Sequence, residues 1–298
     1  MSDLQKVSYR VDKTLNRLTT PGGSYGLDKS KLLAQFSRAA ETYKSASSLQ
    51  QTTAADLVDR LNLIGLIPTI ALDLGSATGH VGELLRALVP AVTVINTDFS
   101  KQMASSTPKI DGEIYDVVTT AEKLAFADES IPLVISNMLL HWCDVDDVLP
   151  EVCRILELDG IFLFSTLGPG TLHELRHFWE QVDDSPHVHE FIDIRDLGDA
   201  LIRAGFSEPV LDVDRCVRKH KDVAQLVAEL RGTGGTNARY DRRRSCTGRN
   251  RYRQFVDAYE QIADNDGIPS TWEVIYGLAT KHEAVVKKGL AVAIPGNT

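Results

Sequence analysis

The stretch "ALDLGSATGH", residues 71–80, decides how the chain folds. Its first half is a short apolar run that ends in an acid, Asp73, and its second half carries two glycines, Gly75 and Gly79. A helix-like segment, "VGELLRAL", follows directly. This order predicts a buried strand, then a tight loop whose backbone N–H groups can approach a ligand, then a helix. Ala77 stands where a third glycine would complete a GxGxG pattern.

The same alternation continues along the chain. Further apolar runs, "VTVINT", "EIYDVV", "LVISNM" and "GIFLFST", are bounded by turn residues and separated by segments that can form helices. Short buried strands alternating with helices predict an α/β fold with a doubly wound, mostly parallel sheet. After Pro169 the pattern changes to helical stretches such as "TLHELRHFWEQV" and "NRYRQFVDAYEQIA". We predict an appendage over residues 1–30, one domain over 31–283 with helical cap insertions at about 170–190 and 220–265, and a tail over 284–298.

Composition excludes several classes of protein. The 298 residues are 43% hydrophobic and 24% charged, without an apolar run of membrane-spanning length or a signal-peptide pattern. The four cysteines are scattered without a CxxC pair, which favours a reducing compartment, and we expect a cytoplasmic protein without a membrane partner. A net charge of −9 argues against nucleic-acid binding. His187 and His189 form an "HVH" stretch without a third ligand at suitable spacing, so no metal site is predicted.

One region runs against the overall charge. Residues 215–253 contain twelve Lys and Arg against three acids. Such a basic segment can steer an acidic partner, or it can be an ordinary solvated loop.

The glycine loop alone does not identify its ligand. A dinucleotide-binding fold usually reads GxGxxG, whereas here an acid precedes the glycines, and no phosphate-binding lysine follows as in a P-loop. The next strand ends in a second acid, Asp98, at a position suited to ribose hydroxyls.

With these residues in place, a family resemblance becomes clear. "ALDLGSATG", "NTDFSKQM", "TAEKLAFADES" and "LVISNMLLHW" resemble the successive motifs of class I S-adenosylmethionine-dependent methyltransferases. The resemblance implies a Rossmann-like sheet of seven strands, with "TWEVIYGLA" as the antiparallel one. It also implies that Asp73 and the backbone of residues 75–79 hold the methionine part of the cofactor, that Asp98 binds the ribose, and that Met103 packs on the adenine. The full cofactor site that it implies is Gln50, Asp73, Gly75, Ser76, Ala77, Gly79, Asp98, Phe99, Met103, Thr120, Ala121, Glu122 and Asn137.

Stretches outside the generic motifs narrow the family further. "FSRAAETYKSASSLQ", "FSTLGPGTLHELR", "LRGTGGTNA" and "GIPSTWEVIYG" together resemble the malonyl-[acyl-carrier protein] O-methyltransferases of biotin biosynthesis. This resemblance implies methyl transfer from S-adenosylmethionine to the free carboxylate of a malonyl thioester on acyl carrier protein, or on coenzyme A, with S-adenosylhomocysteine as product. It places Tyr43 and Arg231 as catalytic candidates, with Arg231 facing the acceptor carboxylate. The substrate candidates are His141 and Trp142 in the pocket wall and the basic residues Arg242, Arg243 and Arg244 facing the carrier.

The chemistry agrees with the absence of a catalytic triad. A malonyl carboxylate has a pKa of about 4 and is ionised at pH 7, so its methylation needs no general base. Alignment of the reactants and exclusion of water remain the main requirements.

Several positions depart from the usual family pattern and keep other functions open. They are Ala77, Thr120, where an adenine-binding Asp is common, Pro132, and Leu158 with Asp159. These departures indicate a divergent member. The alternatives are a methyltransferase-like protein arginine hydroxylase that acts in respiratory complex assembly, and a non-catalytic paralogue that binds a partner.

Overall fold

The computed structural model describes residues 26–107 and 114–282. Its centre is a seven-stranded sheet of order β3-β2-β1-β4-β5-β7-β6. The strands are β1 (Ile70–Leu74), β2 (Thr93–Asp98), β3 (Ile114–Val118), β4 (Ile131–Asn137), β5 (Leu156–Leu167), β6 (Ser207–His220) and β7 (Ile268–Thr280). All neighbouring strands are parallel except that β7 runs antiparallel to both β5 and β6. The predicted class I methyltransferase fold, with "TWEVIYGLA" in the antiparallel strand, is confirmed.

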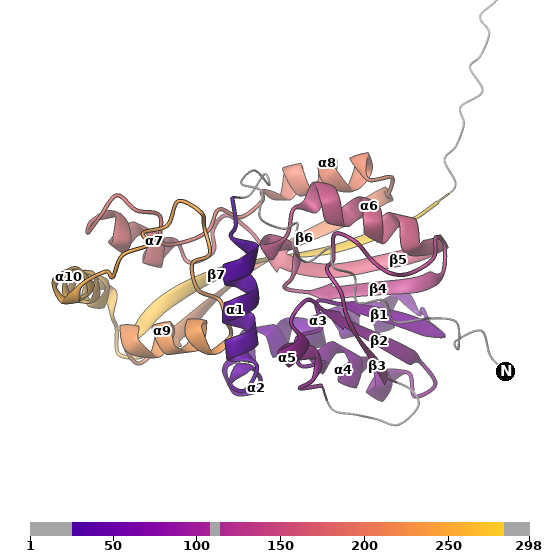
Figure 1. The fold of residues 1–298 in the computed structure, drawn as a ribbon, viewed down its shortest axis with the longest axis horizontal. Coiled ribbons are helices and arrows are strands. Elements are labelled where there is room, and N and C mark those ends of the chain that lie inside the picture. Colours follow the sequence, from indigo (N-terminus) through magenta and orange to yellow (C-terminus); the bar gives the residue numbers. More distant parts are fainter. Residues whose placement is uncertain (1–25, 108–113, 283–298) are drawn as a thin grey trace, which may run out of the picture.

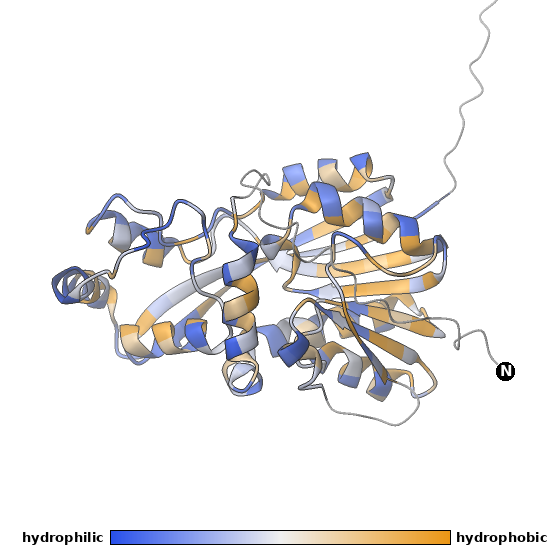
Figure 2. Cartoon of the chain, in the orientation of Figure 1, coloured by the Kyte–Doolittle hydropathy of each residue, from blue (hydrophilic) through white to orange (hydrophobic). Residues whose placement is uncertain are grey.

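Helices cover both faces of this sheet (Figure 1). On one face lie α3 (Ser48–Ile64), α4 (His80–Leu88) and the short α5 (Lys101–Ala104), and on the other lie α6 (Val145–Ile155) and α8 (Ile194–Arg203). The alternation of β1 divides its side chains between two apolar cores, because Ala71 faces the first layer while Leu72 and Leu74 face the second. Figure 2 shows the central strands as the most hydrophobic part of the fold.

A second group of helices lies beyond the carboxyl ends of β4 and β5, beside the extended β7 (Figure 1). It contains α7 (His173–Glu180), α9 (Val223–Gly232), α10 (Arg249–Tyr259) and the 3₁₀ turn η4 (Glu260–Ile262), and we call it the cap. Its packing is aromatic, since the Trp179 ring stacks on Phe255 at 4.1 Å on one side and on His187 at 3.8 Å on the other. α1 (Lys29–Ala39) and α2 (Tyr43–Ala46) lie between the cap and the sheet.

The ends of the predicted domain are only partly visible. Residues 1–25 of the predicted appendage and the predicted tail, 284–298, fall outside the described residues. Within the appendage range, Leu27 forms an antiparallel bridge with Arg239, and α1 already begins at Lys29. No helix in the described part of the chain is long and apolar enough to cross a bilayer.

Candidate active site

The loop after β1 is folded by backbone contacts to the neighbouring strand. The N–H groups of Gly75 and Ser76 both donate to the carbonyl oxygen of Thr97 at 2.8 Å. Gly75 and Gly79 have φ of 77° and 78°, a left-handed conformation that favours glycine. A Cβ at Gly79 would also lie 2.5 Å from the Thr107 side chain, so glycine is required there. The loop can then turn directly into α4.

Ala77 is the third residue of this loop with a positive φ, at 47°. Its N–H donates to Asp98 Oδ2 at 3.1 Å, and its methyl group packs against a small apolar cluster that includes Ala39 and Met103. The methyl group therefore contributes to packing between the loop and α1, at the cost of a backbone conformation that glycine adopts more readily.

Two buried carboxyl groups flank the loop. Asp98 accepts from the N–H groups of Ala77 and Ser100, and burial raises the pKa of Asp98 to about 6. Asp73 is 1% exposed, and neither of its carboxyl oxygens has a hydrogen-bond partner of standard geometry among the described residues. Burial raises the pKa of Asp73 to about 8; the backbone N–H of Gly82 opposes this rise, and the charge of Asp98 adds to it. A buried carboxyl group without a partner fits a ligand that brings a cationic group.

A cavity of about 240 Å³ connects the carboxyl ends of β1, β2 and β4 with the cap. Twelve of the residues predicted for the site line it: Tyr43, Gln50, Gly75, Ala77, Asp98, Phe99, Thr120, Ala121, Glu122, Asn137, His141 and Trp142. Asp73 and Ser76 line a smaller adjoining pocket that shares Tyr43, Gln50, Gly75, Ala77 and Asn137 with the first. The structure therefore brings the sequence motifs together at one site.

The remaining predicted residues lie outside the lining of these two pockets. Gly79 shapes the loop, and Met103 is fully buried behind Ala77. Arg231 is exposed in the last turn of α9, and Arg242, Arg243 and Arg244 lie on the loop between α9 and α10.

The basic loop is fastened to the protein by its own arginines. Arg242 pairs with Asp28, the N-cap of α1, at 2.9 Å, and Arg243 lies 3.4 Å from the carboxylate of Asp183. Arg239 pairs with Glu190 at 3.0 Å. These arginines hold the loop against α1 and the cap, so much of the basic charge seen in the sequence is balanced within the fold.

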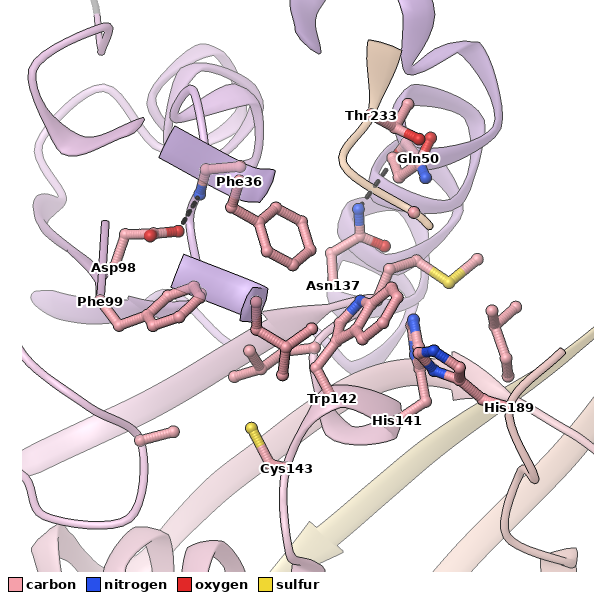
Figure 3. Close-up of a pocket in the computed structure, with 18 of the residues that line it drawn as sticks. Phe36, Gln50, Asp98, Phe99, Asn137, His141, Trp142, Cys143, His189 and Thr233 are labelled. Carbon is pink, nitrogen blue, oxygen red and sulfur yellow. Dashed lines mark hydrogen bonds between the residues drawn. The ribbon is translucent and has the colours of Figure 1, made fainter. Parts of the chain in front are cut away.

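Aromatic rings form a row across the cavity (Figure 3). Phe36 of α1 contacts Phe99 at 5.9 Å and Trp142 at 5.4 Å between ring centroids. Trp142 in turn contacts His141 at 5.0 Å and His189 at 4.8 Å. The row leads from the acids at the sheet end to the cap end, where the lining is apolar and includes Leu167, Leu172, Leu175, Val188, Phe191 and Trp272.

Polar contacts fix the helices that close the cavity. Asn137, at the end of β4, donates to the Gln50 carbonyl oxygen at 2.8 Å and accepts from the hydroxyls of Thr53 and Ser165. Lys29 forms an ion pair with Glu122 across the mouth of the cavity, which ties α1 to the loop after β3. Asn137 and Glu122 thus hold the walls in place as well as lining them.

Several lining residues were not predicted from the sequence. Phe36 lies within the quoted stretch "FSRAAETYKSASSLQ", but nothing in its local pattern separates it from a core aromatic. His189 stands in the "HVH" stretch, which predicts no metal site and gives no sign of a place in a binding cavity. His189 lines the cavity because of how the cap packs against the sheet, and a local sequence motif carries no information about that packing.

Comparisons with known proteins agree with this geometry. A family model described as "Methyltransferase domain" matches residues 72–164. A malonyl-[acyl-carrier protein] O-methyltransferase from Laribacter hongkongensis is 38% identical over 275 residues, covering 88% of this chain and 93% of that protein. This chain belongs to the malonyl-[acyl-carrier protein] O-methyltransferase family. Another member, from Methylovorus sp., is 38% identical over 273 residues, covering 88% of this chain and 92% of its own length.

The similarity to this relative includes the cap, because the aligned part covers 88% of the chain, whereas the methyltransferase-domain model matches residues 72–164 alone. Among solved structures, the YcgJ protein of Bacillus subtilis aligns with a TM-score of 0.56 at 17% identity, over 77% of this chain and 99% of that one. At this identity the likeness shows the shared fold alone. The relatives' names favour the O-methyltransferase interpretation over the arginine hydroxylase.

Proposed function

We propose that this family member methylates the free carboxylate of a malonyl thioester carried by acyl carrier protein, with S-adenosylmethionine as the methyl donor and S-adenosylhomocysteine as product. When bound, S-adenosylmethionine supplies an electrophilic methyl group on a sulfonium. The observation that carries the proposal is the cavity that joins the buried Asp98 to an apolar chamber under the cap, with the buried Asp73 in the adjoining smaller pocket.

The sheet end of the cavity fits the cofactor. Asp98 is held by two backbone N–H groups and keeps further lone pairs for ribose hydroxyls. Asp73 has no ion-pair partner and no hydrogen bond of standard geometry among the described residues, and it suits the ammonium group of the methionine part. Phe99 and Ala121 provide apolar surface for the adenine, while the buried Met103 packs with Phe36, Tyr43 and Ala77 beside the site.

The cap end fits an acceptor that is already ionised. A carboxylate needs no base, so the task of the protein is to align it, exclude water and remove the solvation that lowers its nucleophilicity. The apolar lining beside Trp142, Leu172 and Trp272 meets this need. Tyr43 lines both pockets, and burial together with the charges of Asp98 and Asp73 raises its pKa, so its hydroxyl stays protonated and can donate to either reactant.

Carrier docking is proposed for the outer end of the cap. Arg242 and Arg243 are engaged in internal ion pairs, whereas Arg244 is exposed without one among the described residues. The exposed Arg249, Arg251 and Arg253 of α10 also lack an ion pair within the described chain. We propose that the positive charge of these four exposed arginines, the basic surface of this end of the cap, attracts an acidic carrier.

This surface is connected to the cavity by stacked rings. Phe255 of α10 stacks on Trp179, which stacks on His187 in the cavity lining. A carrier bound at α10 would thus lie at the outer side of the same cap that encloses the acceptor. Arg231 is exposed outside the lining, so a role for it at the acceptor carboxylate would require the end of α9 to move.

The proposal is tested by incubating the protein with S-adenosylmethionine and malonyl-carrier protein and following the acyl group by mass spectrometry. We expect one added methyl on the malonyl group, and slower reaction with malonyl-coenzyme A, which lacks the carrier surface. Cofactor binding without methylation of either thioester would contradict the proposal. Absence of cofactor binding would favour the non-catalytic paralogue.

A further inference from the structure

Three imidazoles line the cavity at the cap end, and one of them, His187, is already paired with Asp183 at 3.1 Å. The cofactor site does not use the other two, His141 and His189. His141 follows β4 in the 3₁₀ turn η3 (Leu140–Trp142), and His189 lies between α7 and α8. Both contact Trp142, and both also contact the Phe191 ring, at 5.9 Å and 6.4 Å. Figure 3 shows the two side chains next to Trp142, at the end of the cavity remote from Asp98.

One hydrogen bond to the His189 ring fixes which of its nitrogens carries the proton. Its Nε2 accepts from the backbone N–H of Ala238 at 3.0 Å, in a buried position. An imidazole nitrogen that accepts carries no proton in the neutral ring, so the proton lies on Nδ1. No group in the described chain is hydrogen-bonded to this Nδ1–H, which leaves it for a ligand.

His141 presents a donor in the same way. Its Nδ1 lies 3.4 Å from the hydroxyl oxygen of Thr166, a side chain with no exposed surface. This nitrogen is the hydrogen-bond partner of the buried Thr166 hydroxyl, and a buried hydroxyl needs an acceptor for its proton, so we assign the hydroxyl as the donor. The ring proton of His141 then lies on Nε2, which also has no partner among the described residues.

Burial keeps both rings neutral. It lowers the pKa of His141 to about 3, with a contribution from His189, and the pKa of His189 to about 4, with a contribution from Arg239. The other fixed charges that line the cavity, within the described residues, are Asp98 and the mutually paired Lys29 and Glu122. No arginine of the described chain lines this cavity.

We propose that the Nε2–H of His141 and the Nδ1–H of His189 bind the free carboxylate of the acceptor. This inference rests on the proposed function and names the groups that recognise the acceptor. Neutral donors orient a carboxylate and replace part of its lost hydration, whereas a buried guanidinium would pair with it and reduce the nucleophilicity of its oxygens. The choice of imidazole over arginine thus matches a reaction in which the carboxylate itself attacks.

The test compares acceptors with and without the carboxylate. His141→Leu and His141→Gln are prepared in the full chain, because glutamine can still present an N–H donor near the position of Nε2 whereas leucine cannot. The exposed His177, on α7 outside the cavity lining, provides the control variant His177→Gln. Malonyl-carrier protein is assayed as substrate, and acetyl-carrier protein, which has no free carboxylate, is assayed as competitive inhibitor.

We expect His141→Leu to lower kcat/KM for malonyl-carrier protein about ten- to a hundredfold, the loss of one hydrogen bond to a charged group. Inhibition by acetyl-carrier protein and the affinity for S-adenosylmethionine should stay unchanged, and His141→Gln should recover part of the activity. His189→Leu should likewise lower kcat/KM for malonyl-carrier protein and leave inhibition by acetyl-carrier protein unchanged. Equal weakening of both acyl carriers, or no change in either, would overturn the inference, and so would equal activity of the Leu and Gln variants. If the wild type binds cofactor but methylates no malonyl thioester, the proposed function fails first.

Discussion

The two ends of the cavity are built in different ways. At the sheet end, one loop of five residues and the acid that ends the next strand are joined by backbone hydrogen bonds, such as those from Gly75 and Ser76 to Thr97. At the cap end, the lining comes from segments as far apart in the chain as His141, Leu230 and Trp272. The sheet end is polar and charged, whereas the cap end is apolar with neutral imidazoles.

This difference indicates a division of work. In the proposed function, S-adenosylmethionine is held by groups that a short motif can specify, because the strand and loop geometry fixes them locally. The proposed acceptor site is a surface that exists only when the cap, α1 and the sheet are assembled. Changes at one end should therefore affect one reactant and spare the other.

Among substitutions that should weaken the binding of one reactant and spare the other, Asp98→Ala is expected to have the largest effect. Asp98→Ala would remove the proposed charge-assisted hydrogen bonds to the ribose, worth about 1.5–3 kcal/mol, so the affinity for S-adenosylmethionine should fall about tenfold to more than a hundredfold. Inhibition by acetyl-carrier protein should change little. Isothermal calorimetry and the inhibition assay measure the two quantities. Unchanged cofactor affinity would show that Asp98 does not contact the cofactor.

Asp73 should couple cofactor binding to proton release. Burial raises its pKa to about 8, so the unliganded carboxyl is mostly protonated at pH 7, and pairing with an ammonium group favours its ionised form. S-adenosylmethionine should thus bind with release of about one proton at pH 7, and more tightly as the pH rises from 6 to 8. Calorimetry in buffers of different ionisation enthalpy measures this release. Asp73→Asn should abolish it, and a heat independent of the buffer in the wild type would contradict the assignment.

The same carboxyl should destabilise the unliganded protein. Because the folded-state pKa of Asp73 lies above the ordinary value of about 4, the folded protein holds an extra proton between about pH 4 and 8. Its contribution to the free energy of unfolding therefore falls as the pH rises through that window. At pH 8, Asp73→Asn should raise this free energy by about 1–3 kcal/mol. Urea unfolding at pH 5 and pH 8 checks this, and an equal effect of the substitution at both would contradict it.

A smaller effect is expected from the basic surface of α10. Reversing the charges of Arg249, Arg251 and Arg253 should raise KM for malonyl-carrier protein about three- to tenfold, since each exposed pair contributes little. The effect should shrink above about 0.15 M salt and be absent with malonyl-coenzyme A. Arg203→Glu, an exposed arginine on α8 away from the cap, is the control. Equal effects of the α10 and α8 variants would place carrier docking elsewhere.

The smallest effect is expected at Ala77. Ala77→Gly relieves a φ of 47° but removes a methyl group from the cluster around Met103, so the two contributions oppose each other within about 1 kcal/mol. Cofactor affinity should stay unchanged or increase. A clear loss of affinity by calorimetry would show that the methyl group itself shapes the cofactor site.

The sequence predicts the sheet end well because its signals are local. Asp73, Gly75 and Asp98 stand at strand ends, and parallel strands bring those ends to one edge of the sheet. The antiparallel β7 followed from family resemblance. The basic segment shows the limit of local signals, because ion pairs such as Arg242 with Asp28 join residues far apart in the chain. His189 was missed for the same reason, since its role depends on Trp142 and Ala238 around it.

The central claim is that the methyl group goes to the malonyl oxygen. Mass alone does not show this, because methylation of the acidic malonyl carbon would add the same mass. The direct measurement uses S-adenosylmethionine labelled with ¹³C in its methyl group, malonyl-carrier protein and carbon NMR of the product. We predict the signal of a methoxy carbon, lost on mild alkaline hydrolysis. A labelled methyl bonded to carbon and stable to alkali, or label on the protein carrier alone, would contradict the account.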